Sequence, residues 1–158
     1  MSGRPSYPPG TAAHAIPHPV HDPPRVLVAE DDADMRRLVV EALEADGCIV
    51  ASVPDGGRLL VEIAHQCARE FEAIDLIVSD IRMPVASGLR IVEALRTIHC
   101  WTPVILMTAF GDDATRAQAE MLGTLLFDKP FEVDDLRAAA RSLLHPVRGR
   151  GRLEDVKV

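Results

Sequence analysis

Short aliphatic runs alternate with longer amphipathic segments along most of this chain. The runs occupy residues 26–29, 48–53, 76–78, 104–107 and 125–127, and their near-continuous apolar character predicts strands buried on both faces of a sheet. In the segments that follow the runs, apolar side chains recur every three or four positions, which predicts five helices. The alternation of strand and helix indicates an α/β domain in which right-handed crossovers join parallel strands and helices cover both faces.

Each predicted helix has one apolar face that we expect to pack against the sheet. The faces are Met35, Leu38, Val39 and Ala42; Leu60, Ile63, Ala64, Cys67 and Phe71; Leu89, Val92 and Leu95; Ala114, Ala117 and Met121; and Val133, Leu136, Ala140 and Leu143. The fourth of these faces, within residues 112–122, is thin.

The two ends of the chain differ in composition from this central pattern. Seven of the twelve prolines lie in residues 1–24, together with three histidines and few large aliphatic residues, so we expect a disordered arm there. A metal site on these histidines is the less favoured alternative, because they do not lie on a regular element. Pro146 ends the last helix, and the alternating Arg and Gly residues after it predict a flexible basic tail over 146–158. The expected domain is therefore 25–145.

Composition and charge narrow the function classes. The three cysteines are widely spaced and form no Cys-x-x-Cys pair, which argues against a disulfide framework or a zinc ribbon and favours the cytoplasm. No apolar stretch approaches the ~20 residues of a membrane span. The net charge of −7 arises within residues 25–145, because the arm is neutral and the tail is net positive. Such an acidic domain repels nucleic acid and suits a cation or a basic partner.

Polar side chains follow four of the five predicted strands. Glu30 and Asp31 come directly after the first strand, and Asp80 follows the third. Thr108 follows the fourth strand and Lys129 the fifth. Because ligands of an open parallel sheet bind beyond the carboxyl ends of its strands, we expect these side chains to meet on one rim.

Each of these residues has a simpler explanation when it is taken alone. Asp31 or Asp32 can cap the helix that follows, and we assign the cap to Asp32. Asp80 alone is compatible with a turn residue, Thr108 with a strand end and Lys129 with a solvated lysine. Their convergence on one rim favours a single site over a series of coincidences.

The chemistry of such a cluster is restrictive. Two carboxylates ~4 Å apart repel by about 4 kcal/mol at an effective dielectric of 20, so Glu30, Asp31 and Asp80 together must take up a proton or hold a cation. Oxygen ligands that leave room for water favour Mg²⁺, and a main-chain carbonyl just after Asp80 adds a further ligand. With Lys129 and Thr108 aimed at the same point, Asp80 is suited to attack phosphorus and accept a phosphoryl group.

Four segments carry a resemblance to a known family. VLVAEDDADMR (26–36), DLIVSDIRMP (75–84) followed by Ser87-Gly88, PVILMTA (103–109) and FDKPF (127–131) resemble the signature regions of the receiver domains of bacterial two-component response regulators. The resemblance covers residues 25–145. It implies a flavodoxin-like, doubly wound α/β fold, in which a five-stranded parallel sheet of order 2-1-3-4-5 carries five helices.

The resemblance also implies the metal ligands and the phosphoryl acceptor. Glu30 and Asp31 correspond to the acidic pair that holds Mg²⁺ in the family. Asp80 corresponds to the phospho-accepting aspartate, which is itself a metal ligand. The main-chain carbonyl of Arg82 corresponds to the remaining protein ligand.

The implied function is a phosphorylation-dependent switch of a two-component phosphorelay. Thr108 corresponds to the switch hydroxyl and Lys129 to the lysine that pairs with the phosphoryl group, and the Lys129–Pro130 bond is expected to be cis. The implied partners are a sensor histidine kinase or a phosphotransfer protein, and an unidentified downstream protein. The chain would be a cytoplasmic regulatory protein rather than an enzyme. Because 13 residues follow His145, too few for a DNA-binding module, we expect its output to work through protein contacts.

One position departs from the family pattern. An aromatic residue often stands three residues before the lysine, but Leu126 occupies that position here, and Phe127 should point to the opposite face of the strand. This departure leaves open a second function, a receiver-like interaction module that signals without phosphate. Arg82 and Phe110 occupy sites that in this family tune the lifetime of the phosphoryl group.

Two further functions are disfavoured. An aspartyl-phosphate hydrolase would need a second acid two residues after the nucleophile, where Arg82 stands. A dinucleotide-binding domain would need a Gly-rich loop after the first strand, where this sequence has acids.

Overall fold

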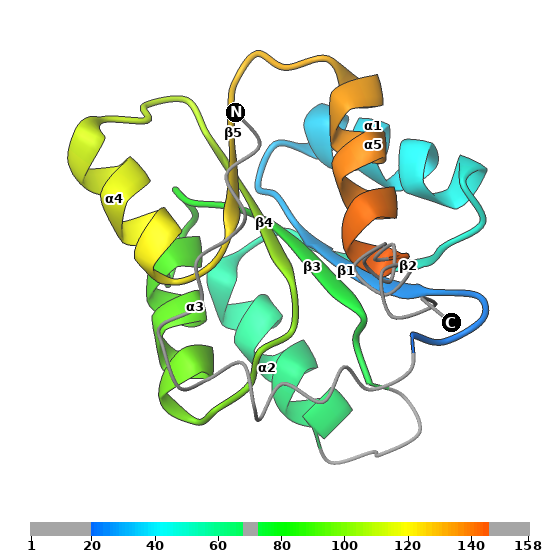
Figure 1. Cartoon of the computed structure of the whole chain (residues 1–158), viewed down its shortest axis with the longest axis horizontal. Helices are drawn as coiled ribbons and strands as arrows, with labels where there is room; N and C mark the ends of the chain where they lie inside the picture. The colour runs from blue at the N-terminus through cyan, green and yellow to red at the C-terminus, as the bar shows by residue number, and fades with distance from the viewer. Residues whose placement is uncertain (1–19, 68–72, 146–158) are drawn as a thin grey trace, which may run out of the picture.

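The computed structural model describes residues 20–67 and 73–145. Within these residues, five strands and five helices alternate along the chain, as the hydrophobic pattern predicts (Figure 1). The strands are β1 (Arg25–Ala29), β2 (Ile49–Val53), β3 (Leu76–Asp80), β4 (Val104–Thr108) and β5 (Leu125–Asp128). The helices are α1 (Ala33–Ala45), α2 (Gly56–Cys67), α3 (Gly88–Thr97), α4 (Asp113–Met121) and α5 (Val133–Leu144). No helix in the described ranges combines the length and apolar character needed to cross a membrane.

The strands form one parallel sheet in the order β2-β1-β3-β4-β5. This confirms the flavodoxin-like order that the family resemblance implies. Ala29 of β1 is in register with Ser79 of β3, so the residues that come next in each strand, Glu30 and Asp80, reach the same edge of the sheet side by side. Figure 1 shows α1 and α5 together on one face, with α2 and α3 on the other.

The central strands supply the apolar core on both faces. Leu27 and Ile77 pack with residues of α2 and α3, whereas Val28 and Val78 pack with residues of α1 and α5. All four side chains are at most 3% exposed, and full burial of such a side chain contributes about 1.5–3 kcal/mol. The aliphatic runs of these strands therefore hold both helical layers in place.

The two outer strands are less buried than the sequence predicts. Residues 49, 51 and 52 of β2 are exposed, and Ile49 retains 50% of its accessible surface. In β5, Leu125, Leu126 and Phe127 are all partly buried. The prediction of burial on both faces was wrong for these strands, because an edge strand has a sheet neighbour on one side only, which an aliphatic run does not reveal.

Three helices bury only part of the predicted face, or, in α4, a different residue. Leu38 of α1, Leu60 of α2 and Met121 of α4 are exposed by 47%, 43% and 77%, and Ala114 and Ala117 are also exposed. The buried hydrophobic residues of these helices are Val39, Leu43, Leu59, Ile63 and Ala119, of which Val39 and Ile63 belong to the predicted faces. Adjacent apolar residues, as at 38–39 and 59–60, fit two helical faces equally well, and the sheet selects one of them. Phe71 and the side chain of Cys67 lie outside the described residues.

The predicted faces of α3 and α5 are confirmed in their centres. Leu89, Val92, Leu95, Leu136 and Ala140 are all buried. The three- and four-residue spacing of these residues matches the face that packs on the sheet.

Residues 20–24 fall in the predicted arm but pack on the domain. Val20 contacts the core cluster on the α1 and α5 side. The His21 N–H donates to the Asp75 carboxylate at 3.3 Å, and His21 Nδ1 lies 3.0 Å from the same group. The Arg25 N–H donates to it as well, at 2.8 Å. The packed domain therefore begins before Arg25, while the rest of the predicted arm (1–19) and the predicted tail (146–158) lie outside the described residues.

Candidate functional site

The side chains predicted to share one rim do come together. Glu30, Asp80 and Thr108 are 0%, 6% and 1% exposed, respectively, and each lies at or directly after the end of its strand. Asp31 is exposed and Lys129 is partly buried. One carboxylate oxygen each from Glu30, Asp31 and Asp80 lies within 4.8 Å of the other two. The strand order thus assembles residues that are far apart in the sequence.

Lys129 lies between the two buried acids. Its Nζ is 2.7 Å from Glu30 Oε2 and 2.9 Å from Asp80 Oδ2. The Lys129 N–H donates to the Thr108 carbonyl at 2.7 Å, which holds the loop after β5 against the end of β4. The Lys129–Pro130 bond is cis, as expected.

Backbone N–H groups hold the two buried carboxylates, and Arg36 holds the backbone of Glu30. The Asp32 N–H donates to Glu30 Oε1 at 3.1 Å, and the Arg82 N–H donates to Asp80 Oδ1 at 3.2 Å. Arg36 Nη1 donates to the Glu30 carbonyl at 2.8 Å, a contact that the sequence did not identify. The only indication of this contact in the sequence was that Arg36 is the last residue of the segment 26–36, the first that resembles the family.

Asp32 and Asp31 lie where the sequence predicts. Asp32 is the N-cap of α1, because its Oδ1 accepts from the Met35 N–H at 2.8 Å. Asp31 belongs to the acidic cluster instead. At the start of α3, an added Cβ on Gly88 would lie 2.4 Å from the Asp80 carbonyl oxygen. Glycine therefore allows α3 to begin directly against the end of β3.

The electrostatics show an excess of negative charge. The pKa of Glu30 is raised to about 7, mainly because the group is buried and in smaller part because Asp80 is negatively charged. Hydrogen bonds to Lys129 and from the Asp32 N–H act in the opposite direction. Burial acts to lower the pKa of Lys129, but hydrogen bonds to Glu30 and Asp80 outweigh it and carry the pKa above its usual value. One ammonium thus faces three carboxyl groups, and a cation would relieve the remaining repulsion.

The donor set fits Mg²⁺. All three side chains offer hard carboxylate oxygens, and the exposed position of Asp31 leaves the cluster accessible to the water ligands that Mg²⁺ retains. The turn after Asp80 is held by the Arg82 N–H. The role of the Arg82 carbonyl as a further ligand stays a prediction.

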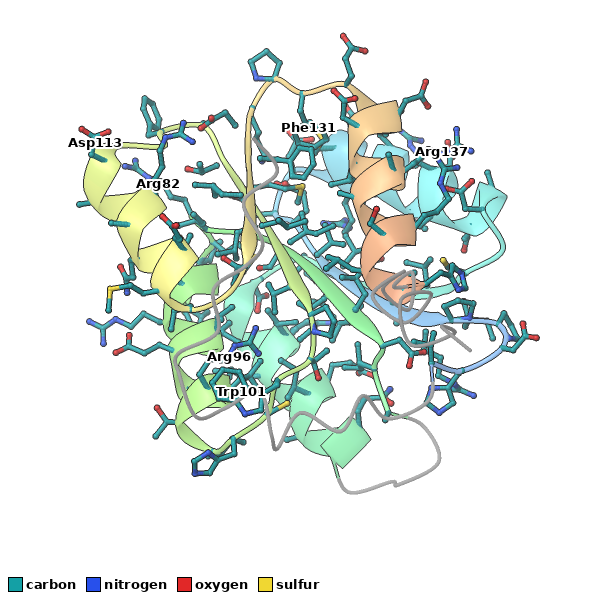
Figure 2. The ribbon with its side chains drawn as sticks, viewed as in Figure 1. Arg82, Arg96, Trp101, Asp113, Phe131 and Arg137 are labelled. Carbon is teal, nitrogen blue, oxygen red and sulfur yellow. The ribbon has the colours of Figure 1, made fainter. Side chains whose placement is uncertain are left out.

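Arg82 and Phe110 form a contact above this rim. The Arg82 guanidinium carbon lies 4.7 Å from the centre of the Phe110 ring, which is a cation–π geometry. The Phe110 N–H donates to Thr108 Oγ1 at 3.1 Å. Figure 2 labels Arg82 on the side of the molecule where α4 lies. The sequence singled out both residues but not their contact with each other.

The position of the missing aromatic residue lies on β5. Leu126 packs against the core on the α2 and α3 side, and Phe127 packs on the opposite face. There Phe127 makes an edge-to-face contact with Phe131, with ring centres 5.7 Å apart. This confirms the predicted alternation. An ion pair between Arg116 and Asp128 ties α4 to β5, and nothing in the spacing of these two residues predicted it.

The comparison with protein families decides the classification. The family model described as response regulator receiver domain matches residues 26–141. This chain belongs to that family. It is 35% identical over 127 residues to the response regulator protein PmrA of Pseudomonas aeruginosa, covering 80% of this chain and 55% of that protein. It is 33% identical over 121 residues to the transcriptional regulatory protein CpxR of Escherichia coli, covering 76% of this chain and 49% of that protein. The receiver chain thus spans about half the length of these curated relatives.

Solved receiver structures agree with the fold. The receiver domain of the Francisella response regulator 1452 has a TM-score of 0.68 and 28% identity, covering 77% of this chain and 96% of that one. The Vibrio cholerae chemotaxis protein CheY4 has a TM-score of 0.64 and 27% identity, covering 75% and 97%. The chain is therefore a regulatory receiver domain of two-component, phosphorylation-based signalling.

Proposed function

We propose that this receiver domain accepts a phosphoryl group on Asp80, with Mg²⁺ held by Glu30, Asp31, Asp80 and the main-chain carbonyl of Arg82. The observation that carries the proposal is the position of Lys129. Its ammonium lies 2.9 Å from Asp80 and 2.7 Å from Glu30, inside a cluster of three carboxyl groups. That arrangement places positive charge where the oxygens of a phosphoryl group on Asp80 would lie.

The proposed transfer exchanges one bond to phosphorus for another. An oxygen of the Asp80 carboxylate forms a bond to phosphorus, while the bond between phosphorus and the imidazole nitrogen of a donor phosphohistidine breaks. The nitrogen keeps the electron pair and takes up a proton from solvent. Bound Mg²⁺ supplies charge neutralisation for the phosphoryl oxygens. Lys129 neutralises further charge, and the Arg82 N–H holds Asp80 in place.

The signal leaves the site through Thr108 in this proposal. Its hydroxyl accepts from the Phe110 N–H and turns toward the phosphoryl group once Asp80 is phosphorylated. That movement shifts the face formed by α4, β5 and α5 between two populated states. Chemical-shift changes on this face after phosphorylation are expected, and changes limited to the immediate surroundings of Asp80 would contradict this step.

The proposed partners follow from the same chemistry. The donor is a sensor histidine kinase or a phosphotransfer protein in the cytoplasm. The output is a contact with a downstream protein. The chain acts as a regulatory protein whose own residues assist its phosphorylation and dephosphorylation.

Intact-mass spectrometry tests the proposal. The full chain is incubated with acetyl phosphate, with and without Mg²⁺, as wild type, Asp80→Asn and Asp32→Asn. Asp32→Asn is the matched control, since it makes the same charge change next to the site and Asn still caps a helix. We expect one added phosphoryl group on the wild type and on the control, only with Mg²⁺, and none on Asp80→Asn. An equal gain on Asp80→Asn would overturn the proposal.

The second candidate function is an interaction module that does not use phosphate. The observation that favours it is Leu126, an aliphatic residue packed into the core where an aromatic switch residue often stands. A folded wild type that Mg²⁺ stabilises but acetyl phosphate does not modify would make this second function the better one.

A further inference from the structure

The loop from Glu30 to Asp32 joins β1 to α1 and carries two of the three carboxylates of the acidic cluster. β1 ends at Ala29, and the Glu30 N–H continues the pairing with β2 by donating to the Val53 carbonyl at 3.2 Å. The Glu30 carbonyl accepts from Arg36 Nη1 of α1 at 2.8 Å. An arginine side chain therefore holds the main chain at the point where the strand ends.

Arg36 contacts this loop on both sides of Asp31. Its side chain bonds to the Glu30 carbonyl, and its own N–H donates to the Asp32 carbonyl at 2.9 Å. The Asp32 N–H in turn donates to Glu30 Oε1 at 3.1 Å. Because the Asp31 side chain is exposed, packing does little to direct it, and its direction depends on the backbone of its two neighbours.

Two planar peptide units flank Asp31, and both are held. The Glu30 carbonyl belongs to the unit between Glu30 and Asp31, so the bond from Arg36 fixes the plane of that unit. The Asp32 N–H belongs to the next unit, which Glu30 Oε1 holds. Rotation about the backbone bonds of Asp31 is therefore restricted. One oxygen of its carboxylate lies within 4.8 Å of oxygens of Glu30 and Asp80, despite the repulsion among these groups.

We propose that Arg36 is a positioning residue for metal binding, which fixes the peptide unit between Glu30 and Asp31 so that both carboxylates point at one ion. This inference rests on the proposed function, because it takes Glu30 and Asp31 to be Mg²⁺ ligands. Groups that orient metal ligands without touching the metal typically contribute 10–100-fold to its affinity. Arg36 has this role through a main-chain oxygen.

The positive charge of Arg36 by itself predicts the opposite effect on affinity. A guanidinium near a cation site repels the cation, so removing only its charge would strengthen Mg²⁺ binding. Removing a bond that positions the ligands would weaken Mg²⁺ binding. A purely structural role would lower the stability of the fold and leave the affinity of the folded chain unchanged. The sign of the change in affinity therefore separates the three roles.

The test titrates the ¹⁵N-labelled full chain with MgCl₂ and obtains the dissociation constant from the amide chemical shifts, whose dispersion also shows that each variant is folded. Arg36→Met should bind Mg²⁺ about tenfold more weakly than the wild type. Arg37→Met is the matched control, because it makes the same charge change at a residue whose Nη2 pairs with Asp34 on the exposed surface. The control should bind Mg²⁺ as the wild type does, or more tightly. An affinity of Arg36→Met equal to or above that of the wild type would overturn the proposal.

Two further variants complete the test. Arg36→Gln makes the same charge change with a shorter, polar side chain, and it should show the same loss of affinity even if Arg36→Met does not fold. Arg36→Lys keeps the charge and a donor, so it should bind Mg²⁺ more tightly than Arg36→Gln. Equal affinities of these two variants would contradict a role for the donor. If the wild type itself gives no saturable shifts, the proposed function fails and this inference with it. If the wild type binds Mg²⁺ and Arg36→Gln binds it equally well, this inference alone fails.

Discussion

Arg82 and Phe110 are two exposed residues next to the acidic site whose side chains contact each other. Each is tied to it through its backbone, Arg82 to Asp80 and Phe110 to Thr108. Their cation–π contact at 4.7 Å contributes about 0.5–1 kcal/mol at an exposed position. If the pair limits the approach of water to a phosphoryl group on Asp80, loss of the ring must shorten the lifetime of that group.

We predict that Phe110→Ala speeds the loss of the phosphoryl group by about two- to fivefold, the rate equivalent of the contact energy. The decay of the phosphorylated mass after removal of acetyl phosphate measures this rate. Ile98→Ala, at an exposed residue after α3, is the control and should decay as the wild type does. An unchanged half-life in Phe110→Ala would contradict a shielding role.

Val85 has a backbone conformation that does not suit its side chain. Its φ is +75°, in the left-handed region that β-branched residues rarely adopt. The side chain is also 84% exposed, so little packing offsets the strain. The strained residue lies in the loop between β3 and α3, close to the predicted metal ligand Arg82.

We predict that Val85→Asn raises the free energy of unfolding by about 1 kcal/mol, because Asn tolerates this conformation. Denaturant unfolding of the metal-free chain measures the change. Val61→Asn makes the same substitution on the exposed surface of α2 and should give no gain, since Val and Asn have similar helix propensities. A less stable Val85→Asn would show that the loop conformation is not strained.

Helices α1 and α5 are joined by an ion cluster at Asp46, which caps the carboxyl end of α1. Asp46 accepts from Arg137 Nη2 at 2.6 Å and from Arg137 Nε at 3.1 Å, and Arg141 Nη1 lies 3.7 Å away. Figure 2 shows Arg137 on the side of α5 that faces α1. The hydrogen bond to Arg137 holds the pKa of Asp46 below its usual value of 3.8.

We predict that Asp46→Asn lowers the free energy of unfolding by about 1 kcal/mol near neutral pH. The lowered folded-state pKa means that the contribution of Asp46 is present above the unfolded pKa of 3.8 and is lost as the pH falls through the folded value. The difference from wild type should therefore shrink below about pH 4. Asp34→Asn, whose side chain is 89% exposed, should show little change. A difference that does not depend on pH would contradict this explanation.

Some elements could be predicted from the sequence and others could not, for physical reasons. The central strands β1, β3 and β4 are buried on both faces, as their aliphatic runs predict. The exposure of β2 and of Met121 depends on which elements pack beside them, and the local sequence pattern does not show this. The ion pair between Arg116 and Asp128 exists only because α4 packs beside β5.

The site itself was more predictable than the surfaces around it. Lys129 and Glu30 are separated by 99 positions, yet both follow parallel strands, whose carboxyl ends share one edge. The sequence could not show which oxygen each donor meets, nor that Gln66 would be left with a buried, unpaired carbonyl. Those details depend on side-chain packing rather than on element order.

Metal binding links this site to the stability of the folded chain. A cation that binds only the folded state stabilises it by mass action, and Asp80 is expected to be one of its ligands. We predict that Mg²⁺ raises the melting temperature of the wild type more than that of Asp80→Asn, with Asp32→Asn responding as the wild type does. An equal response of the wild type and Asp80→Asn in a thermal unfolding experiment would show that Asp80 does not bind the metal.

The position of the phosphoryl group decides between the proposed switch and its alternatives. Borohydride reduces an aspartyl phosphate to homoserine, which peptide mass spectrometry locates to one residue. After treatment with acetyl phosphate and Mg²⁺, we expect homoserine at position 80 alone, and none when Mg²⁺ is omitted. Homoserine at position 31 or 32, or a phosphoryl group on a histidine that survives reduction, would contradict the assignment of Asp80 as the acceptor.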